Sequence, residues 1–243
     1  MNDDKVVSDL SHIGIKEPVL NNDIFEAKLA LSQEEKRLCH EIRYSAYHQF
    51  GFVDERDDGL FSDRYDDQQN YWTIIVFKNE IPSATIRVAL YDPENPDDDF
   101  HSTQAMEIFD QEIKTVVSNA ALPGRSGKSI ELGKLARSRS AESDLYAIFA
   151  AFRAAGYIGL HYDVDAVLNA VRRHHMPVYR RFGFRILEQP RPYPGLNFET
   201  GLIGLFRDDY AVAKNKVSFM SRMSPHDIIG ANLMSGKKIQ IFI

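Results

Sequence analysis

Residues 129–139 constrain this chain more than any other stretch. They read Ser-Ile-Glu-Leu-Gly-Lys-Leu-Ala-Arg-Ser-Arg, in which apolar and polar residues alternate, and a helical pattern follows after Ser140. The alternation predicts a strand, and Gly133 inside it predicts a β-bulge, which shifts the facing of side chains by one residue. Glu131 and Lys134 can then share one face. Burying a carboxylate and an ammonium on an apolar strand is costly, so the sequence indicates either a structural ion pair or a site of chemistry.

Composition narrows the class of protein. Of the 243 residues, 44% are apolar and 26% are charged, which is typical of a globular domain. The formal net charge of -6 and the pI near 5.8 argue against a nucleic-acid partner, because neutralising phosphates needs a basic face. There is no apolar run of about 18 residues, so we expect no integral membrane segment. Residues 1–20 lack a signal-peptide pattern, and the single Cys39 suits a reducing compartment, so we expect a cytoplasmic location.

Periodicity and turn signals predict an α/β (α+β) protein with a twisted mixed sheet flanked by helices. We divide the chain into an N-terminal tail at 1–24, one folded domain at 25–207 and a C-terminal helical appendix at 208–243. The sequence does not define a role for the appendix. The expected strands are 24–31, 71–77, 83–91, 129–139, 164–171, 184–188 and 201–206, and the expected helices are 33–49, 103–120, 142–158, 172–183 and 208–223.

Isolated charges in apolar patterns mark candidate site residues. Arg43 lies one helical step from the apolar face of helix 33–49, where it either reaches inward or extends to solvent. Asp63 and Asp66 lie in an acidic loop and could converge on a cation, although such clusters are usually solvated. Arg87 stands in the middle of a strand, where it needs an acidic partner or an anionic ligand because it cannot lose its charge.

A second charged region follows strand 164–171. Against a negative net charge this concentration of basic residues is unusual, and it indicates either an anionic partner or a solvated helix face. Adjacent histidines on a helix point in different directions, so we predict no metal site there. The residues are Arg172, Arg173, His174, His175, Arg180, Arg181 and Arg185.

The order of elements resembles the acyltransferase fold of the GCN5-related N-acetyltransferase (GNAT) superfamily. The segment from Pro177 to Phe184 is similar to the tyrosine-to-Gly-Phe ending that recurs in that superfamily. The resemblance implies that members using acyl-coenzyme A follow the central strand with a glycine-rich turn that binds the pyrophosphate. Here residues 137–143 contain no glycine. We therefore expect an acyl donor without that pyrophosphate.

The loop and the first helix resemble a branch of the superfamily that takes acyl groups from acyl carrier protein. This branch comprises the acyl-homoserine-lactone synthases and the N-acyl amino acid synthases of the FeeM type. Residues 63–66, Asp-Arg-Tyr-Asp, are similar to the Asp-x-aromatic-Asp motif of these synthases. Arg43 and Tyr47 match an arginine followed four residues later by an aromatic residue. Phe50 and Phe52 occupy the region where the lactone synthases carry a tryptophan, which weakens the case for S-adenosylmethionine as acceptor.

The strands carry the rest of the resemblance, which covers roughly residues 25–207. Arg87 matches an arginine on the strand after the hairpin, and Glu131 with Lys134 resembles a Glu-x-x-Arg motif in which lysine replaces arginine. The string from Leu132 to Ser138 is closer to the N-acyl amino acid synthases, so we expect this chain to belong with them.

The resemblance and the chemistry together give each candidate residue a role. Glu131 is the expected proton acceptor, Lys134 is a second catalytic candidate, and a backbone N–H freed by the bulge near Gly133 is expected to polarise the thioester carbonyl. Arg87, Arg43 or Lys134 would hold the carboxylate of the amino acid. Asp63 and Asp66 would either position its ammonium group or order Arg43 and Arg87. The expected substrate-binding residues are Arg43, Tyr47, Asp63, Asp66, Arg87, Leu135, Arg137, Phe149 and Phe152, with Val167 in the acyl slot, and those expected to dock the carrier protein are Arg172, Arg173, Arg180 and Arg181.

These expectations leave several functions open. The favoured one moves a fatty acyl group from acyl carrier protein to a free amino acid, with no cofactor beyond the acyl thioester, which could also be acyl-coenzyme A. Alternatives are an acyl-homoserine-lactone synthase-like enzyme, an acetyl-coenzyme A-dependent N-acetyltransferase and an acyl-binding domain without catalysis. The sequence leaves the acceptor amino acid, the chain length and the oligomeric state undefined.

Overall fold

The structure is a computed structural model that describes residues 23–121, 123–193, 195–224, 226 and 228–241. Residues 1–22 of the tail expected at 1–24 lie outside the described residues. Residues 1–20, which lack a signal-peptide pattern, are likewise outside the described residues.

The described residues form one mixed sheet in the order β6-β8-β5-β4-β3-β2-β1-β9, with β7 paired to β8. Strands β4 and β5 pair in parallel, whereas the other pairs are antiparallel. The mixed α/β architecture expected from the sequence is confirmed. The strands are β1 (Phe25–Leu29), β2 (Tyr71–Lys78), β3 (Ile81–Tyr91), β4 (Ser129–Arg137), β5 (Ala166–Arg172), β6 (Arg185–Ile186), β7 (Arg191–Pro192), β8 (Glu199–Phe206) and β9 (Ile239–Ile241).

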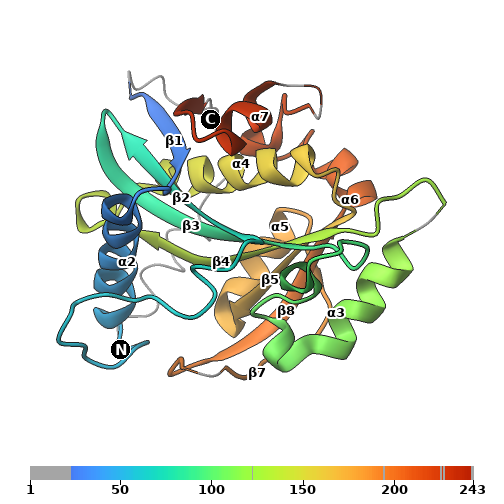
Figure 1. Ribbon diagram of the computed structural model, residues 1–243, viewed down its shortest axis with the longest axis horizontal. Helices are drawn as coiled ribbons and strands as arrows, with labels where there is room; N and C mark the ends of the chain where they lie inside the picture. Colours follow the sequence, from blue (N-terminus) through green and yellow to red (C-terminus); the bar gives the residue numbers. More distant parts are fainter. Residues whose placement is uncertain (1–22, 122, 194, 225, 227, 242–243) are drawn as a thin grey trace.

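Helices cover both faces of this sheet. Figure 1 shows α4 running along one face with α7 stacked on it, while α2 and α3 lie on the other side. The α-helices are α2 (Gln33–His48), α3 (Met106–Ala120), α4 (Leu145–His161), α5 (Met176–Arg181), α6 (Arg207–Ala213) and α7 (Ile228–Met234). Short 3-10 turns lie at Asp98–His101, Arg139–Ala141, Arg173–His175 and Ser218–Met220.

Side-chain alternation explains which helix covers which face. Ile74, Ile86 and Ile130 are fully buried in one core with the alanine-rich α4. Leu168, on the opposite face, packs with Phe109 of α3 in a second core. The sheet therefore separates an apolar α4 side from a side that α2 and α3 cover.

Local signals located the helix ends well. Ser32 accepts the Glu35 N–H at 3.2 Å, and the Glu35 side chain accepts the Ser32 N–H at 3.0 Å, so a capping box begins α2 at the expected place. Gly183 follows α5 with a φ of +94°, which favours glycine and explains why this helix ends there. The basic segment expected as one helix is instead divided, because Arg172 ends β5 and a 3-10 turn precedes α5.

The C-terminal segment differs most from expectation. The helix expected over 208–223 is wrong: α6 ends at Ala213, and a 3-10 turn follows at Ser218–Met220. The segment expected as a helical appendix also contributes a strand, because Ile239 and Ile241 of β9 pair with Ala27 and Phe25 of β1. Pairing with β1 depends on contacts across more than 200 residues of sequence, which local periodicity does not reveal.

Candidate active site

The expected bulge is present in β4, one residue after the glycine that signalled it. Arg87 of β3 pairs with Gly133, and Thr85 pairs with Ala136, so Lys134 and Leu135 together stand opposite Ile86. Lys134 has a φ of 51°. A bulge leaves one residue of the strand out of the ladder, so it supplies a backbone N–H that the neighbouring strand does not require.

A buried ion cluster lies on the α2 side of the sheet, next to the bulge. The Arg43 guanidinium donates to Asp66 Oδ1 at 2.7 Å and to Thr73 Oγ1 at 2.7 Å, and Arg43 is fully buried. Burial alone would raise the pKa of Asp66, but the charges of Arg43 and Arg87 outweigh it and hold that pKa below its usual range. Arg43 therefore reaches inward, one of the two readings that the sequence left open.

Arg87 occupies the centre of the same cluster. Its Nη1 lies 2.6 Å from Asp63 Oδ1 and 3.0 Å from Asp66 Oδ1, and its Nη2 donates to Gln104 Oε1. Burial raises the pKa of Asp63, but the charges of Arg87 and Lys134 lower it by more. The pKa of Asp63 therefore lies below its usual range. Asp63 and Asp66 thus act as partners of Arg43 and Arg87. Neither arginine lines the main cavity, which is described below.

Lys134 joins the cluster to the cavity. Its Nζ lies 3.1 Å from Asp63 Oδ2 and 4.1 Å from the centre of the Phe61 ring. Burial, together with the charge of Arg87, lowers the pKa of Lys134 to about 8 although Asp63 opposes the shift. Of the three basic residues expected to hold a carboxylate, Lys134 is the one that lines the cavity.

Glu131 lies beneath the bulge and is 6% exposed. Its Oε2 accepts the backbone N–H of Ala105 at 2.8 Å. Burial raises the pKa of Glu131, against the opposing hydrogen bonds from Thr103 and Ala105 and the charge of Arg87. A Cβ placed on Gly133 would lie 3.8 Å from Glu131 Oε1, and Gly133 itself lines the cavity. The glycine therefore separates the carboxylate from the cavity with no side chain between them.

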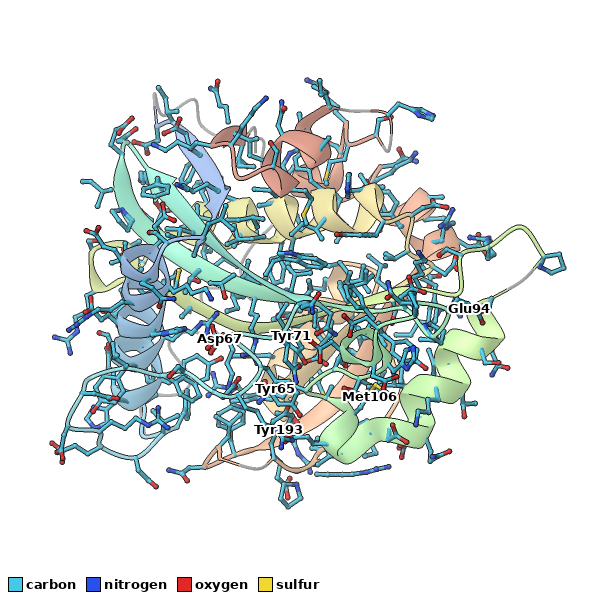
Figure 2. The ribbon with its side chains drawn as sticks, viewed as in Figure 1. Tyr65, Asp67, Tyr71, Glu94, Met106 and Tyr193 are labelled. Carbon is cyan, nitrogen blue, oxygen red and sulfur yellow. The ribbon has the colours of Figure 1, made fainter. Side chains whose placement is uncertain are left out.

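Aromatic side chains enclose the buried carboxylate. The Tyr65 and Tyr71 rings are 5.2 Å apart, and Figure 2 shows both near Tyr193, between α2 and α3. Burial and the nearby Glu131 charge raise the pKa of Tyr71 and Tyr193 far above the usual range. These phenols stay protonated at neutral pH, so they add no negative charge near Glu131.

The main cavity, of about 260 Å³, lies where β4 and β5 part. The two strands pair from Ser129↔Ala166 to Leu132↔Asn169, and the bulge follows at once. Tyr47 of α2 and Phe149 of α4 both line the cavity, although they come from helices on opposite faces of the sheet. The cavity therefore reaches both faces through the gap between the strands.

The two ends of this cavity differ in chemistry. On the α2 side, the lining contains Lys134 and aromatic residues that include Tyr47 and Phe52. On the α4 side the lining is apolar, and it includes the expected Leu135, Phe149 and Phe152. Arg137 lines the cavity as well, as expected, whereas Val167 lines a neighbouring cavity.

The turn between β4 and α4 is closed by its own chain. The N–H groups of Ala141, Glu142 and Asp144 donate to Ser138, Arg139 and Ala141 carbonyls at 3.0, 3.4 and 2.9 Å. The Asp144 side chain caps α4 by accepting the Tyr146 N–H at 2.9 Å. A carboxylate therefore occupies the helix start, where a bound phosphate would otherwise accept N–H groups.

Helix α5 has two different faces. Val178, Tyr179 and Phe182 line the main cavity, whereas Arg180 and Arg181 are exposed. Arg173, before the helix, is also exposed and lies 3.5 Å from Glu199. These arginines therefore flank a cavity wall on the outer surface.

Arg172 is one of the expected docking residues, but it lies apart from the exposed arginines. Its guanidinium lies 4.0 Å from the Phe52 ring centre and 5.5 Å from that of Phe198, and it lines the main cavity. Stacking on two aromatic rings explains why an arginine at the end of β5 turns into the cavity. Sequence could not reveal this contact because Phe52, Arg172 and Phe198 lie far apart in the chain.

Asn169 is a further residue that the sequence analysis missed. It is 2% exposed, lines the main cavity beside Leu132, and its Oδ1 accepts no hydrogen bond from the described part of the chain. A buried amide oxygen without a partner is costly, and a ligand in the cavity could satisfy it. In the sequence, the feature that points to this residue is an asparagine inside an otherwise apolar strand.

Among the residues that the structure describes, no three His, Cys, Asp or Glu side chains are grouped to hold a metal ion. None of the helices in the described ranges has the length and apolar character to cross a bilayer.

Proteins of known structure share this fold, although their sequences differ widely from this one. No curated protein sequence matches the chain significantly. The fold is similar to FeeM, an N-acyl amino acid synthase from uncultured soil microbes, with a TM-score of 0.59, 14% identity, and coverage of 77% of this chain and 93% of that chain. It is also similar to the AHL synthase LasI, with a TM-score of 0.50, 15% identity, and coverage of 74% and 88%. The CoA-dependent acyl-homoserine lactone synthase BjaI gives a TM-score of 0.50, 14% identity, and coverage of 88% and 99%.

The structural likenesses establish the shared fold, and a sequence match establishes the family. The family model described as N-acyl amino acid synthase FeeM matches residues 38–205. This range spans more than half of the chain and includes the ion cluster, the bulged strand and the main cavity. The chain therefore belongs to the N-acyl amino acid synthase FeeM family and is an acyltransferase.

Proposed function

We propose that this enzyme transfers a fatty acyl group from the thioester of acyl carrier protein to the amino group of a free amino acid. The observation that carries the proposal is the bulge in β4, because Gly133 and Lys134 line the cavity between β4 and β5 and the Glu131 carboxylate lies directly behind Gly133. The product is an N-acyl amino acid and the free thiol of the carrier. No cofactor other than the acyl thioester takes part.

The acceptor would bind at the α2 side of the cavity. Lys134 would pair with the carboxylate of the amino acid, because it is the basic residue of the ion cluster that lines the cavity. Arg87 would act indirectly, by holding Asp63, which in turn positions Lys134 at 3.1 Å. Arg43 would hold Asp66, which accepts the Asp63 N–H. Tyr47 and Phe52 would contact the side chain of the acceptor.

Glu131 would take the proton that the acceptor ammonium must lose. Its raised pKa favours this role, since a general base works best when its pKa lies near the working pH. The missing side chain at Gly133 leaves a short path from the cavity to Glu131 Oε1 for the amine or a bridging water. The neutral amine then attacks the thioester carbonyl.

The bulge would stabilise the tetrahedral intermediate. A backbone N–H near Lys134 or Leu135 would donate to the oxyanion, which develops only after attack. A C–N bond forms and the C–S bond breaks. Of the two protons that the ammonium nitrogen loses, one returns from Glu131 to the departing thiolate and the other passes to solvent.

Carrier protein is favoured over coenzyme A as donor because of the start of α4. The N–H groups of Ala141, Glu142 and Asp144 in the preceding turn are engaged within that turn, and Asp144 accepts the Tyr146 N–H at the helix start, so a pyrophosphate would meet a carboxylate. The exposed Arg173, Arg180 and Arg181 suit docking of an acidic carrier protein through complementary charge. A carrier-bound donor agrees with the cytoplasmic location expected from the sequence.

The proposal is tested by the lipids that cells make and by purified reactions. Cells expressing the protein should accumulate N-acyl amino acids, measured by mass spectrometry, and cells expressing Glu131→Gln should not. With purified enzyme, Glu131→Gln should lower kcat by about 10²- to 10⁴-fold. Near-normal turnover by this variant, without a shift of the pH profile, would show that Glu131 is not the base.

Comparing donors separates the alternatives. At equal chain length, kcat/KM should be higher for acyl carrier protein than for acyl-coenzyme A. The reverse order would favour a coenzyme A-dependent N-acetyltransferase, and a lactone product would favour an acyl-homoserine-lactone synthase. Acyl binding without acylation of any amine would favour an acyl-binding domain.

A further inference from the structure

A second cavity, of about 290 Å³, lies on the α4 side of the sheet. Its walls come from α4, β5 and the segment that runs from α6 to Met223. Gly156, Val167, Phe219 and Met223 are among the residues that line it. This cavity lies farther along α4 than the main one, toward the start of β4 and β5.

The two cavities meet at a thin partition. Leu132, Phe152, Tyr179 and Phe182 line both cavities. The Phe152 and Tyr179 rings are 5.8 Å apart, and those of Tyr179 and Phe182 are 6.4 Å apart. Three aromatic rings and one leucine are therefore shared by the walls of both cavities, and rotation of these side chains would open a path between the two spaces.

The second cavity is built for an apolar occupant. Arg153 at its wall is turned away, because its Nη1 donates to the carbonyls of Phe219 and Ser221 at 2.9 and 2.7 Å. Arg207 is paired with Asp165 at 3.1 Å. Phenylalanine and methionine side chains make up much of the remaining wall, and methionine adapts easily to the shape of a ligand. A cavity of this kind favours hydrocarbon over water.

The volumes indicate the size of the occupant. An apolar cavity of about 150 Å³ holds one benzene ring, so the main cavity of about 260 Å³ has room for about ten non-hydrogen atoms. The reacting thioester and the acceptor fill part of that space. The two cavities together have room for about twenty such atoms.

The outer wall of the second cavity lies beyond the family match, which ends at residue 205. Phe206, Tyr210, Phe219 and Met223 belong to this wall. The shape of the second cavity therefore depends on the C-terminal segment of this chain.

We propose that a long acyl chain, of about 14 to 16 carbons, extends from the main cavity into the second one. This inference rests on the proposed function. Phe152 and Tyr179 form the partition through which the chain passes, and residues 206–223 set how far it extends. Acyl groups of about eight carbons extend little beyond the partition. The second cavity is thus the determinant of acyl chain length.

The test compares hexadecanoyl and octanoyl carrier thioesters with the full-length enzyme. The measured quantity is the ratio of kcat/KM for the longer donor to that for the shorter donor, which should exceed one for the unmodified enzyme. Val167→Phe fills the second cavity and should lower this ratio at least tenfold. Ala211→Phe, at the rim of the same cavity, should lower it as well and provides a second variant if Val167→Phe does not fold.

Val212→Phe is the matched control. Val212 follows Ala211 on α6, is 56% exposed and is not part of the described cavity lining, so this variant should leave the ratio unchanged. An unmodified enzyme that prefers octanoyl donors, or an equal ratio in Ala211→Phe and Val212→Phe, would overturn the chain-length inference while leaving the proposed function intact. Absence of transfer from every carrier thioester would instead overturn the proposed function, and the inference with it.

Discussion

At the scale of single residues, charge balance around the bulge determines what each group can do. Arg43, Arg87 and Lys134 bring three positive charges into one buried cluster, while Asp63 and Asp66 bring two negative ones. Burial lowers the pKa of Lys134 to about 8, so Lys134 loses its positive charge more readily than the two arginines do. Lys134 is therefore the member of the cluster whose charge changes within the working range of an enzyme.

The first prediction concerns the alkaline pH dependence. Lys134 is charged below pH 8 and neutral above it, so its contact with an acceptor carboxylate should weaken as the pH rises through 8. Arginine stays charged, so the ratio of kcat/KM for the amino acid in the native enzyme to that in Lys134→Arg should fall by about tenfold between pH 7 and 9. The ratio cancels the ionisation of the substrate itself. A ratio that stays constant over this range would contradict the role of Lys134.

The second prediction concerns Asp66, which contacts two buried guanidinium groups. Asp66→Asn would leave Arg43 and Arg87 without this partner, and breaking such a buried pair costs about 3–5 kcal/mol. Urea unfolding followed through the single Trp72 measures the loss. Asp67→Asn is the control, because its side chain is 83% exposed and its pair with Lys36 contributes at most about 1 kcal/mol.

The two possible roles of Asp66 give different results. If Asp66 orders the arginines, stability falls strongly in Asp66→Asn and only slightly in Asp67→Asn. If Asp66 mainly binds the acceptor ammonium, both variants unfold at similar urea concentrations and only the KM for the amino acid rises.

At the scale of elements, local signals were sufficient where a single residue type carries the geometry. Gly133 predicted the bulge, and the expected helix 172–183 ends at Gly183, which follows α5 in the structure, because glycine adopts backbone conformations that other residues avoid. The contact that buries Glu131 comes from Ala105, 26 residues away, and no pattern in either segment indicates it. The sequence likewise does not distinguish Arg172 from its exposed neighbours, because its contacts with Phe52 and Phe198 form only in the folded chain.

The third prediction concerns the exposed face of α5. Reversing Arg180 and Arg181 to glutamate should raise the KM for acyl carrier protein about tenfold at low salt, with little change in kcat, because complementary charge mainly guides docking. The effect should shrink at high salt, where exposed charges are screened. Kinetics with an acyl-pantetheine donor should not change, since that donor has no protein surface.

Arg37→Glu with Lys114→Glu is the matched control for α5. Both side chains are exposed on other helices, and the pair changes the net charge by the same amount. If this control raises the KM for the carrier as much as the α5 variant does, then net charge rather than the α5 surface governs docking.

At the scale of the whole molecule, the sheet is completed by the two ends of the described chain. β9 adds to the outer edge of β1, and α7 packs on α4, so the C-terminal segment covers one end of the core. Ile239 and Ile241 belong to the same core cluster as Phe25, Ala27 and the interior of α4. The sequence of this segment shows only a short apolar run, and its pairing with β1 depends on contacts that periodicity cannot indicate.

The last prediction tests whether β9 is part of the fold or an addition to it. Ile239 and Ile241 are 6% and 3% exposed, and replacing either with alanine should lower the free energy of unfolding by about 2–4 kcal/mol. Gln240 lies between them with its side chain exposed on the same strand, so Gln240→Ala should change stability by less than about 0.5 kcal/mol. Urea unfolding measures all three variants under the same conditions. Equal unfolding midpoints for all three variants would mean that the sheet is stable without its ninth strand.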